Sequence, residues 1–193
     1  GDPLFFGEYP RSMRDRLADI LPEFTAEEQK LLTSGCDFLG INHYYTNYTS
    51  DNFIENSIPN FPAALHSFDS LDASWKTTQM GWSIVPIGFR KLLKWIKDRY
   101  GDIPILVTEN GCAVDDDQDR CDYIGDYTQA MIDAIEIDKV NVRGYFYWSL
   151  MDNFEWGFGY TKQFGIIECS PENTNRRPKK SFYFYKDFLI WYS

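Results

Sequence analysis

The sequence is poor in basic residues, and this shortage excludes several classes of protein. It has 19 Lys and Arg against 29 Asp and Glu, which gives a formal net charge of −10. A protein that binds nucleic acid needs a basic face for the phosphates, and one that docks on an anionic membrane needs a basic face for the headgroups. We therefore expect neither a nucleic acid nor a membrane as a partner.

Patterns that bind metals or form disulfides are also scarce. The four Cys form no C-x-x-C pair and there are only two His, so we expect no zinc site. Cys112 and Cys121 are close enough in the chain to pair, and the three Asp at 115–117 fit either a solvated loop or a calcium-binding loop. No apolar run is long enough to span a bilayer.

Aromatic side chains, in contrast, are abundant. They make up 18% of the chain, with six Trp, thirteen Tyr and fifteen Phe. One interpretation is a bulky hydrophobic core. The other is a sugar-binding site, because the C–H faces of pyranose rings pack on aromatic planes while Trp N–H and Tyr O–H groups bind hydroxyls. Composition alone leaves both interpretations open.

Helical and strand patterns alternate along the chain and predict an α/β fold with parallel strands. A capping box at 25–28 predicts a helix that begins there. Capping residues and apolar spacing predict further helices at 86–100, at 123–138 and from about 181. Strands are predicted from short apolar runs at 37–42, 104–108 and 144–148. Residues 46–80 show no periodicity, which is typical of a functional loop or a disordered one.

Polar or aromatic residues follow each predicted strand. They are Asn42 and Tyr44, then Glu109 and Asn110, then Trp148 and Glu155. In α/β sheets and barrels, ligands bind at the C-terminal ends of the strands. The three strand ends are therefore predicted to converge on one candidate site.

Four runs of residues resemble the family 1 glycoside hydrolases, the β-glucosidase and β-galactosidase group. They are residues 7–10 (Gly-Glu-Tyr-Pro), 37–44 (Asp-Phe-Leu-Gly-Ile-Asn-His-Tyr), 107–111 (Val-Thr-Glu-Asn-Gly) and 142–156 (Val-Arg-Gly-Tyr-Phe-Tyr-Trp-Ser-Leu-Met-Asp-Asn-Phe-Glu-Trp). Residues 164–165 and 176–179 also fit. The resemblance covers nearly the whole chain. It implies that residues 1–193 are the C-terminal portion of a single (β/α)8-barrel (TIM-barrel) domain, with roughly its last three β/α units.

The resemblance gives catalytic roles to Glu109 and Tyr44. Glu109 matches the family's nucleophile, which attacks the anomeric carbon and forms a glycosyl-enzyme intermediate. Tyr44 matches the Tyr that hydrogen-bonds this carboxylate and favours its ionised form. The residues alone favour Glu109 as a loop residue that caps the next helix, and Tyr44 could belong to the core or the rim of the site.

Substrate-binding roles follow in the same way. Trp148 matches the platform under the bound sugar, although a core Trp would look the same in the sequence. Glu155 and Trp156 match the pair that reads the sugar hydroxyls, and a carboxylate can accept two hydrogen bonds from adjacent hydroxyls. The negative charge of Glu155 disfavours a 6-phosphorylated sugar.

Four further residues are assigned less directly. Asn42 is assigned to substrate binding, in a positioning and not a chemical role, and is predicted on the same strand face as Tyr44 because the two are two residues apart. Phe164 is expected to line the pocket. Trp75 and Trp82 either line the leaving-group side of the site or have a structural role.

The function implied by the resemblance is that of a retaining β-glycosidase that hydrolyses β-glucoside-like small molecules without a cofactor. The family's acid/base Glu lies in a Thr-x-Asn-Glu-Pro motif, and no Asn-Glu-Pro occurs in the chain. The chain also begins with Gly1 and has no targeting segment, so we expect an N-terminal part to be missing and assign no compartment. We expect the chain alone to be inactive. Because strands cut from a barrel have unpaired edges, we expect it to aggregate, self-associate or pair with a complementary N-terminal half.

Other functions remain open at this point. Within the same family they are a sugar-binding pseudoenzyme, a thioglucosidase and a transglycosidase. A non-enzymatic, aromatic-rich interaction domain is the fourth alternative, and it would not need a carboxylate at the end of a strand. The sequence indicates neither the sugar nor the leaving group.

Overall fold

The computed structural model describes residues 1–17, 20–51, 67–170, 172 and 175–192. The described residues form two compact units, one within residues 1–37 and 49–69 and the other within residues 38–48 and 70–193. In these ranges no helix is long and apolar enough to cross a membrane.

Among its described residues, the first unit has three short helices, α1 (Asp2–Phe6), α2 (Arg11–Leu17) and α3 (Ala26–Leu32). The capping box predicted for α3 is confirmed: the backbone N–H of Glu28 donates to the Thr25 hydroxyl (3.2 Å), and the Thr25 N–H donates to the Glu28 carboxylate (2.8 Å). These two bonds satisfy donors that the first turn of a helix leaves free.

Two short strands interrupt the stretch that the sequence predicted to be irregular. β2 (Tyr48–Asp51) and β3 (Ser67–Ser70) pair as a two-stranded sheet. The prediction of a loop over 46–80 was therefore wrong at these strands, and its residues 52–66 lie outside the described part of the chain. β2 (Tyr-Thr-Ser-Asp) and β3 (Ser-Phe-Asp-Ser) are short and mostly polar, so neither shows the apolar run or alternation from which a strand is predicted.

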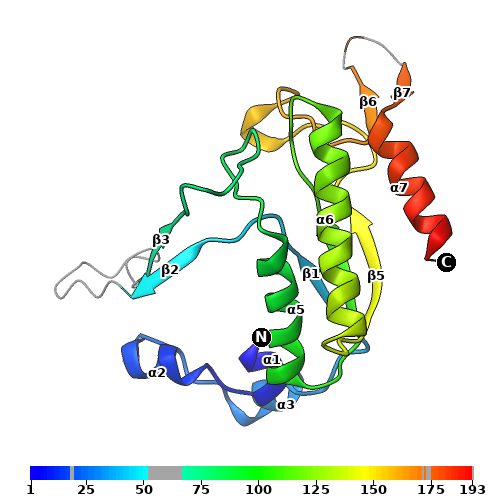
Figure 1. Cartoon of the computed structure of the whole chain (residues 1–193). Helices are drawn as coiled ribbons and strands as arrows, with labels where there is room; N and C mark the ends of the chain where they lie inside the picture. The colour runs from blue at the N-terminus through cyan, green and yellow to red at the C-terminus, as the bar shows by residue number, and fades with distance from the viewer. Residues whose placement is uncertain (18–19, 52–66, 171, 173–174, 193) are drawn as a thin grey trace. The chain divides into compact units, whose positions relative to one another are not determined.

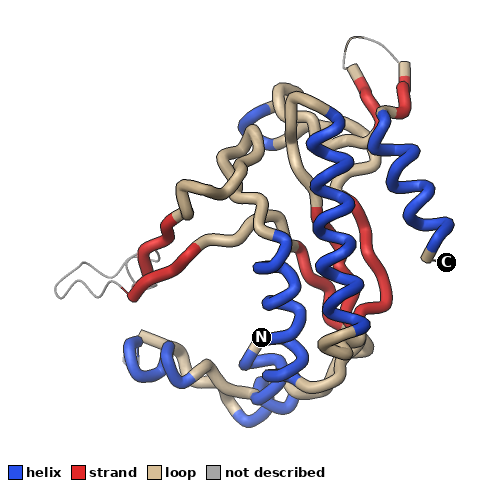
Figure 2. Tube along the Cα trace, in the orientation of Figure 1, coloured by secondary structure: helices blue, strands red, loops and turns tan. Residues whose placement is uncertain are grey.

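The second unit is built on a parallel sheet, as predicted. β1 (Leu39–Asn42), β4 (Ile105–Asn110) and β5 (Val142–Tyr147) are paired in the order β1-β4-β5. The helices α5 (Pro86–Tyr100) and α6 (Asp117–Glu136) lie side by side against one face of this sheet (Figures 1 and 2). This is the α/β arrangement expected from the alternation of helix and strand patterns.

The core lies between the sheet and these two helices. The predicted apolar stripe of α5 is confirmed by Phe89, Leu93 and Ile96, which are buried against Ile105 and Val107 of the central strand. On α6 the inward stripe carries two tyrosines as well as aliphatic residues. Phe89, Tyr123 and Tyr127 are buried in this core, which fits the first of the two compositional interpretations for these three residues.

The start of α6 differs from the prediction by six residues. The helix begins at Asp117, because the Asp116 carboxylate caps it by accepting from the N–H of Gln118 (2.9 Å). Acidic residues at the first turn also interact favourably with the helix dipole. The three Asp thus begin a helix, and no metal-binding group of His, Cys, Asp or Glu was found among the described residues. Cys112 and Cys121 are both free.

The C-terminal part adds a hairpin and a helix. β6 (Ile167–Cys169) and β7 (Arg176–Pro178) are antiparallel and were not predicted, because three-residue strands carry almost no pattern. Helix α7 (Lys180–Trp191) follows, and its Phe182 and Tyr185 pack inward as predicted. Leu189 was wrongly predicted to face in, since it is 46% exposed.

The second face of the three-stranded sheet is exposed in the part of the chain that the structure describes. Asn42, Thr108 and Phe146 lie on it, one on each strand, and all three are exposed. They alternate with buried or partly buried neighbours, as the pleat requires. β1 and β5 are the edge strands of this sheet.

Candidate active site

A cavity of about 400 Å³ lies where β1, β4 and β5 end. Six of the seven predicted site residues line it: Tyr44, Glu109, Trp148, Glu155, Trp156 and Phe164. Met80, Trp82, Gly157 and Phe158 complete the lining. The structure therefore brings together residues that are spread over more than half of the sequence.

Asn42 is the predicted residue that does not line this cavity. It lies on the exposed face of the sheet, where its side-chain oxygen accepts a hydrogen bond from the Thr108 hydroxyl (2.6 Å). The register of β1 shifts between Ile41 and Asn42, and the strand ends at Asn42. Tyr44 therefore lies beyond the strand on which the alternation was based, and the shared face of Asn42 and Tyr44 stays a prediction.

A short hydrogen bond connects Tyr44 with Glu109. The Tyr44 hydroxyl donates to Glu109 Oε2 at 2.5 Å. Burial raises the pKa of Tyr44 far above its usual value, and the hydrogen bond to Glu109 and the charges of Glu109 and Glu155 raise it further. Tyr44 thus remains protonated at neutral pH and acts as a fixed donor to the carboxylate.

The second carboxylate of the cavity is Glu155. It is buried, and its Oε1 accepts from the indole N–H of Trp148 (3.2 Å). Its backbone N–H donates to Gly159 O (2.7 Å) across the short 3₁₀ helix η1 (Trp156–Phe158). The adjacent Trp156 is 81% exposed. Glu155 therefore lines the buried part of the cavity, and Trp156 lines its solvent-exposed part.

Aromatic rings pack around the Tyr44 side chain. Trp82 lies 5.3 Å from Tyr44 and 6.0 Å from Phe164 between ring centroids, and Phe164 meets Tyr44 edge-on at 6.2 Å. Such tilted and edge-on contacts are the favoured geometries of aromatic pairs. Of the two tryptophans left open by the sequence, Trp82 lines the cavity, whereas Trp75 packs on Tyr48 at 4.8 Å.

A buried amide network supports the two central residues, and sequence reasoning missed it. Asn110 Nδ2 donates to His43 O (2.7 Å) and to the Tyr123 hydroxyl (2.9 Å), while the Tyr145 hydroxyl donates to Asn110 Oδ1 (2.7 Å). Tyr123 in turn donates to the carbonyl of Tyr44 (3.2 Å). Asn110 thus connects the strand of Glu109 with the segment of Tyr44. An Asn at the end of an apolar strand was its sole sequence signal.

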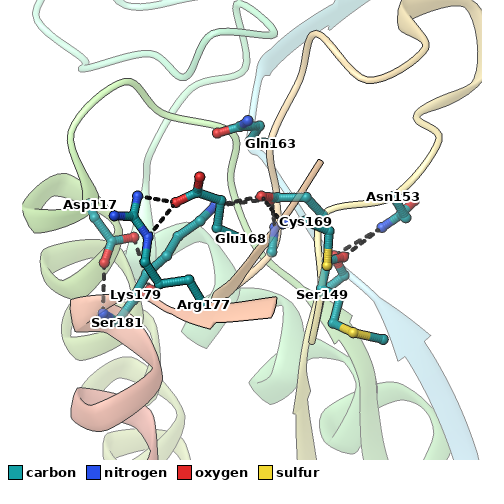
Figure 3. A network of polar contacts seen from close by, with 12 residues as sticks. Asp117, Ser149, Asn153, Gln163, Glu168, Cys169, Arg177, Lys179 and Ser181 are labelled. Atoms are coloured by element: carbon teal, nitrogen blue, oxygen red, sulfur yellow. Dashed lines mark hydrogen bonds and ion pairs between the residues drawn. The ribbon is translucent and has the colours of Figure 1, made fainter. Parts of the chain in front are cut away.

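A second network holds the segment that carries Trp148, Glu155 and Phe164. The carboxylate of the buried Asp152 accepts from the N–H groups of Gly165 (2.9 Å) and Cys169 (3.3 Å) and from Lys179 Nζ (3.0 Å). Figure 3 shows Lys179 and Cys169 in this network. Asp152 lies within this segment, and its carboxylate therefore ties the segment to Gly165 beside Phe164, to β6 and to Lys179.

The start of α7 is bound to α6 beside this network. The Asp117 carboxylate accepts from the backbone N–H of Ser181 (2.7 Å) and from its hydroxyl (2.9 Å), as Figure 3 shows. Asp117 also forms an ion pair with Arg120, whose guanidinium donates to Gln163 O (2.7 Å) next to Phe164. The position of Phe164 in the cavity therefore depends on buried polar contacts as well as on its packing against Tyr44 and Trp82.

His43 makes the stability of this region depend on pH. Its ring is buried against Phe89 and Tyr127, and burial lowers the pKa of His43 from 6.5 to about 4. The unfolded chain binds a proton at higher pH than the folded chain, so stability is lost as pH falls from 6.5 towards 4. We expect the wild-type chain to lose about 3 kcal/mol more than a His43→Leu variant between about pH 7 and about pH 4.

Urea unfolding of both proteins at the two pH values measures this difference. The variant titrates the same carboxylates as the wild type, so the comparison isolates the histidine. A wild-type minus variant difference that does not change with pH would show that His43 is not a buried neutral imidazole.

Comparisons with known proteins show which family the chain resembles in sequence and structure. Residues 1–191 match the family model described as glycosyl hydrolase family 1. Beta-glucosidase 42 of Arabidopsis thaliana is 40% identical over 97% of this chain. Among solved structures, beta-glucosidase 2 of Trichoderma reesei, in complex with Tris, is 37% identical with a TM-score of 0.87 over 99% of this chain. A beta-glucosidase of Humicola insolens, in complex with glucose, is 38% identical with a TM-score of 0.89 over 98% of this chain.

The chain spans less than half of each of these proteins. It covers 42% of the Arabidopsis protein, 44% of the Trichoderma structure and 43% of the Humicola structure. These structural relatives are (β/α)8 barrels. The fold of this chain is therefore a partial (β/α)8 barrel, which confirms the predicted fold class.

Proposed function

The chain belongs to glycosyl hydrolase family 1, and from this premise we propose that Glu109 is the nucleophile of a retaining, β-glucosidase-like site. The observation that supports it best is the 2.5 Å hydrogen bond from Tyr44 to Glu109 Oε2 inside the cavity. A carboxylate held by one oxygen keeps the other oxygen available for attack.

The proposed reaction has two steps. Glu109 Oε1 bonds to the anomeric carbon while the bond from that carbon to the leaving-group oxygen breaks, and the leaving oxygen takes a proton from a carboxylic acid. Water then attacks the anomeric carbon, the bond from that carbon to Glu109 breaks, and a proton of the water passes to the carboxylate that served as the acid. We propose that the acid belongs to barrel units that these 193 residues do not include, because Glu155 has another role.

That role is to bind the sugar. Glu155 has oxygen lone pairs beyond the bond to Trp148, which suits adjacent hydroxyls of a glucose-like ring. We propose that Trp148 is the platform under the ring and that Trp156 and Phe164 complete the pocket. The Humicola insolens relative was solved with glucose, which supports a small-molecule β-glucoside as ligand. The proposed reaction requires no cofactor.

We also propose that residues 1–193 form the C-terminal portion of one barrel domain. The exposed face of the sheet and its edge strands β1 and β5 support this. The complementary N-terminal half is then the proposed partner of the chain.

Covalent labelling tests the assignment of Glu109. The chain is joined to the N-terminal barrel units of the Humicola insolens relative and treated with 2,4-dinitrophenyl 2-deoxy-2-fluoro-β-glucoside. Its leaving group needs no proton donor, and the fluorine slows release of the glycosyl-enzyme. We expect peptide mapping to find the fluorosugar on Glu109.

Two variants make the labelling decisive. Glu109→Gln is expected to take up no label, whereas Asp98→Asn, which changes an exposed carboxylate on α5, is expected to label at the wild-type rate. Label on any other residue, or equal labelling of Glu109→Gln, would contradict the assignment. A protein that binds glucose but never labels would be the sugar-binding pseudoenzyme.

A further inference from the structure

A tight turn brings two side chains into the cavity wall. Thr78 N donates to Trp82 O and Gly81 N donates to Thr78 O, both at 2.9 Å, and Gly81 has a positive φ of 74°. Met80 and Trp82, on either side of that glycine, both line the cavity. Met80 and Trp82 together form what we call the turn wall.

Gln79 attaches this turn to the segment that follows β4. Its backbone N–H donates to Ala113 O (2.9 Å), and its side-chain amide donates to the Asp115 carboxylate. Ala113 and Asp115 follow directly on the run that contains Glu109. The turn wall is therefore bound to the same strand end as the proposed nucleophile.

Lys162 attaches the turn to the segment that follows β5. Its ammonium donates to Gln79 O (3.0 Å) and lies 5.8 Å from the ring centroid of Phe158, another cavity residue. A hydrogen bond from a charged donor contributes more than a neutral one, and the contact with the ring adds to it. The backbone of Gln79 is thus bound on one side to Ala113, after β4, and on the other side to Lys162, after β5.

We propose that Lys162 is a positioning residue that, through Gln79, holds the turn wall against Tyr44 and so sets how well the cavity accepts an aromatic leaving group. The inference rests on the proposed function in one respect, namely that the ligand is a glycoside. Apart from the indole N–H of Trp82, the turn wall and Phe158 present apolar side-chain surface, so the part of a ligand that packs there is apolar. Without the bond from Lys162, the turn keeps its contacts to Ala113 and Asp115 but loses its attachment to the β5 side.

The wall itself can be observed without any ligand. In the full chain labelled with ¹⁵N-tryptophan, a Trp82→Phe variant identifies the Trp82 indole resonance. We expect Lys162→Met to shift or broaden this resonance and to leave that of the distant, exposed Trp95 unchanged. Gln79→Ala, which removes the bond to Asp115, should have a similar effect, whereas Lys162→Arg keeps a donor and should restore most of the wild-type signal.

Lys97→Met is the matched control. Lys97 also donates to backbone carbonyls, those of Asp138 (2.9 Å) and Lys139 (2.8 Å), but on α5 and away from the cavity. A general loss of stability from removing a lysine that binds backbone carbonyls should therefore affect Lys97→Met and Lys162→Met alike. The proposal would be overturned if Lys162→Met left the Trp82 resonance unchanged. It would also be overturned if Lys97→Met changed that resonance as much as Lys162→Met does.

Binding measurements on the same full-chain proteins give the selectivity. With phenyl β-thioglucoside, which the site cannot readily cleave, we expect Lys162→Met to bind about fivefold more weakly, which is about 1 kcal/mol. Glucose binding should change by less than about twofold, because the sugar side lacks the turn wall. Equal weakening for both ligands would show a merely structural role and overturn the proposal. If the wild-type chain binds neither sugar, the proposed function fails for this chain, and the Trp82 resonance alone decides on Lys162.

Discussion

The chain alone is expected to hydrolyse an aryl β-glucoside at least about 100-fold more slowly than the same residues completed by N-terminal barrel units. The cavity contains two carboxylates, Glu109 and Glu155. If Glu109 attacks and Glu155 binds hydroxyls, no group is left to protonate the leaving oxygen. General acid catalysis contributes about 10²–10⁴-fold, so its loss alone accounts for the expected difference.

Tyr44 cannot replace the missing acid. Its pKa is raised by burial and by the neighbouring Glu109, and its proton already forms the 2.5 Å bond that holds that carboxylate. Giving the proton away would place a phenolate beside a carboxylate in a buried site, which is strongly unfavourable.

Initial rates with 4-nitrophenyl β-glucoside measure the effect. The chain alone is compared with the chimera that carries the N-terminal units of the Humicola insolens relative, and with the Glu109→Gln form of that chimera. Of these three proteins, we expect only the chimera with Glu109 intact to turn over the substrate at a substantial rate. Turnover by the isolated chain at the rate of the chimera would mean that a proton donor is present within these residues, and the roles of Glu109 and Glu155 would have to be reassigned.

Gly111→Ala is expected to destabilise the chain by about 3 kcal/mol or more, and to displace Trp148 from the cavity wall. A Cβ at position 111 would lie 1.7 Å from Trp148 O and 2.8 Å from Trp148 C. Both are backbone atoms, and Trp148 N is bound to Asn110 O (2.9 Å), so the two strand ends would have to separate. This explains the glycine next to Glu109: it allows β4 and β5 to approach closely where the site forms.

Gly157→Ala is a matched control for the same substitution. It lies in the 3₁₀ helix η1 after β5, and an added Cβ there meets nothing within 4 Å. For a chain of this size, about 3 kcal/mol corresponds to a fall of roughly 6–12 °C in melting temperature. Thermal unfolding should show this fall for Gly111→Ala and little change for Gly157→Ala. Equal melting temperatures for Gly111→Ala and wild type would refute the close-approach argument.

The elements with strong local patterns were predicted well from the sequence. The apolar stripe of α5 and the capping box of α3 lie where the pattern placed them, and the three parallel strands agree within two residues at either end. Burying one face of a helix or strand imposes a periodicity on neighbouring residues, and that periodicity is visible in the chain. β6, β7 and the β2–β3 pair are too short to show one.

The sequence by itself determined the family and the identity of the residues that meet in the cavity. It did so because the runs around Glu109 and Trp148 are specific in residue type and spacing, and chemistry at a strand end requires particular side chains. Tertiary structure alone decided that Trp82 lines the cavity, that Asn42 does not, and that Lys162 reaches Gln79. These outcomes depend on contacts between loops far apart in sequence, where no local period constrains a side chain. The shortage of basic residues gave only the expectation of no nucleic-acid or membrane partner, whereas the tertiary structure decided which aromatic residues lie in the core and which line the cavity.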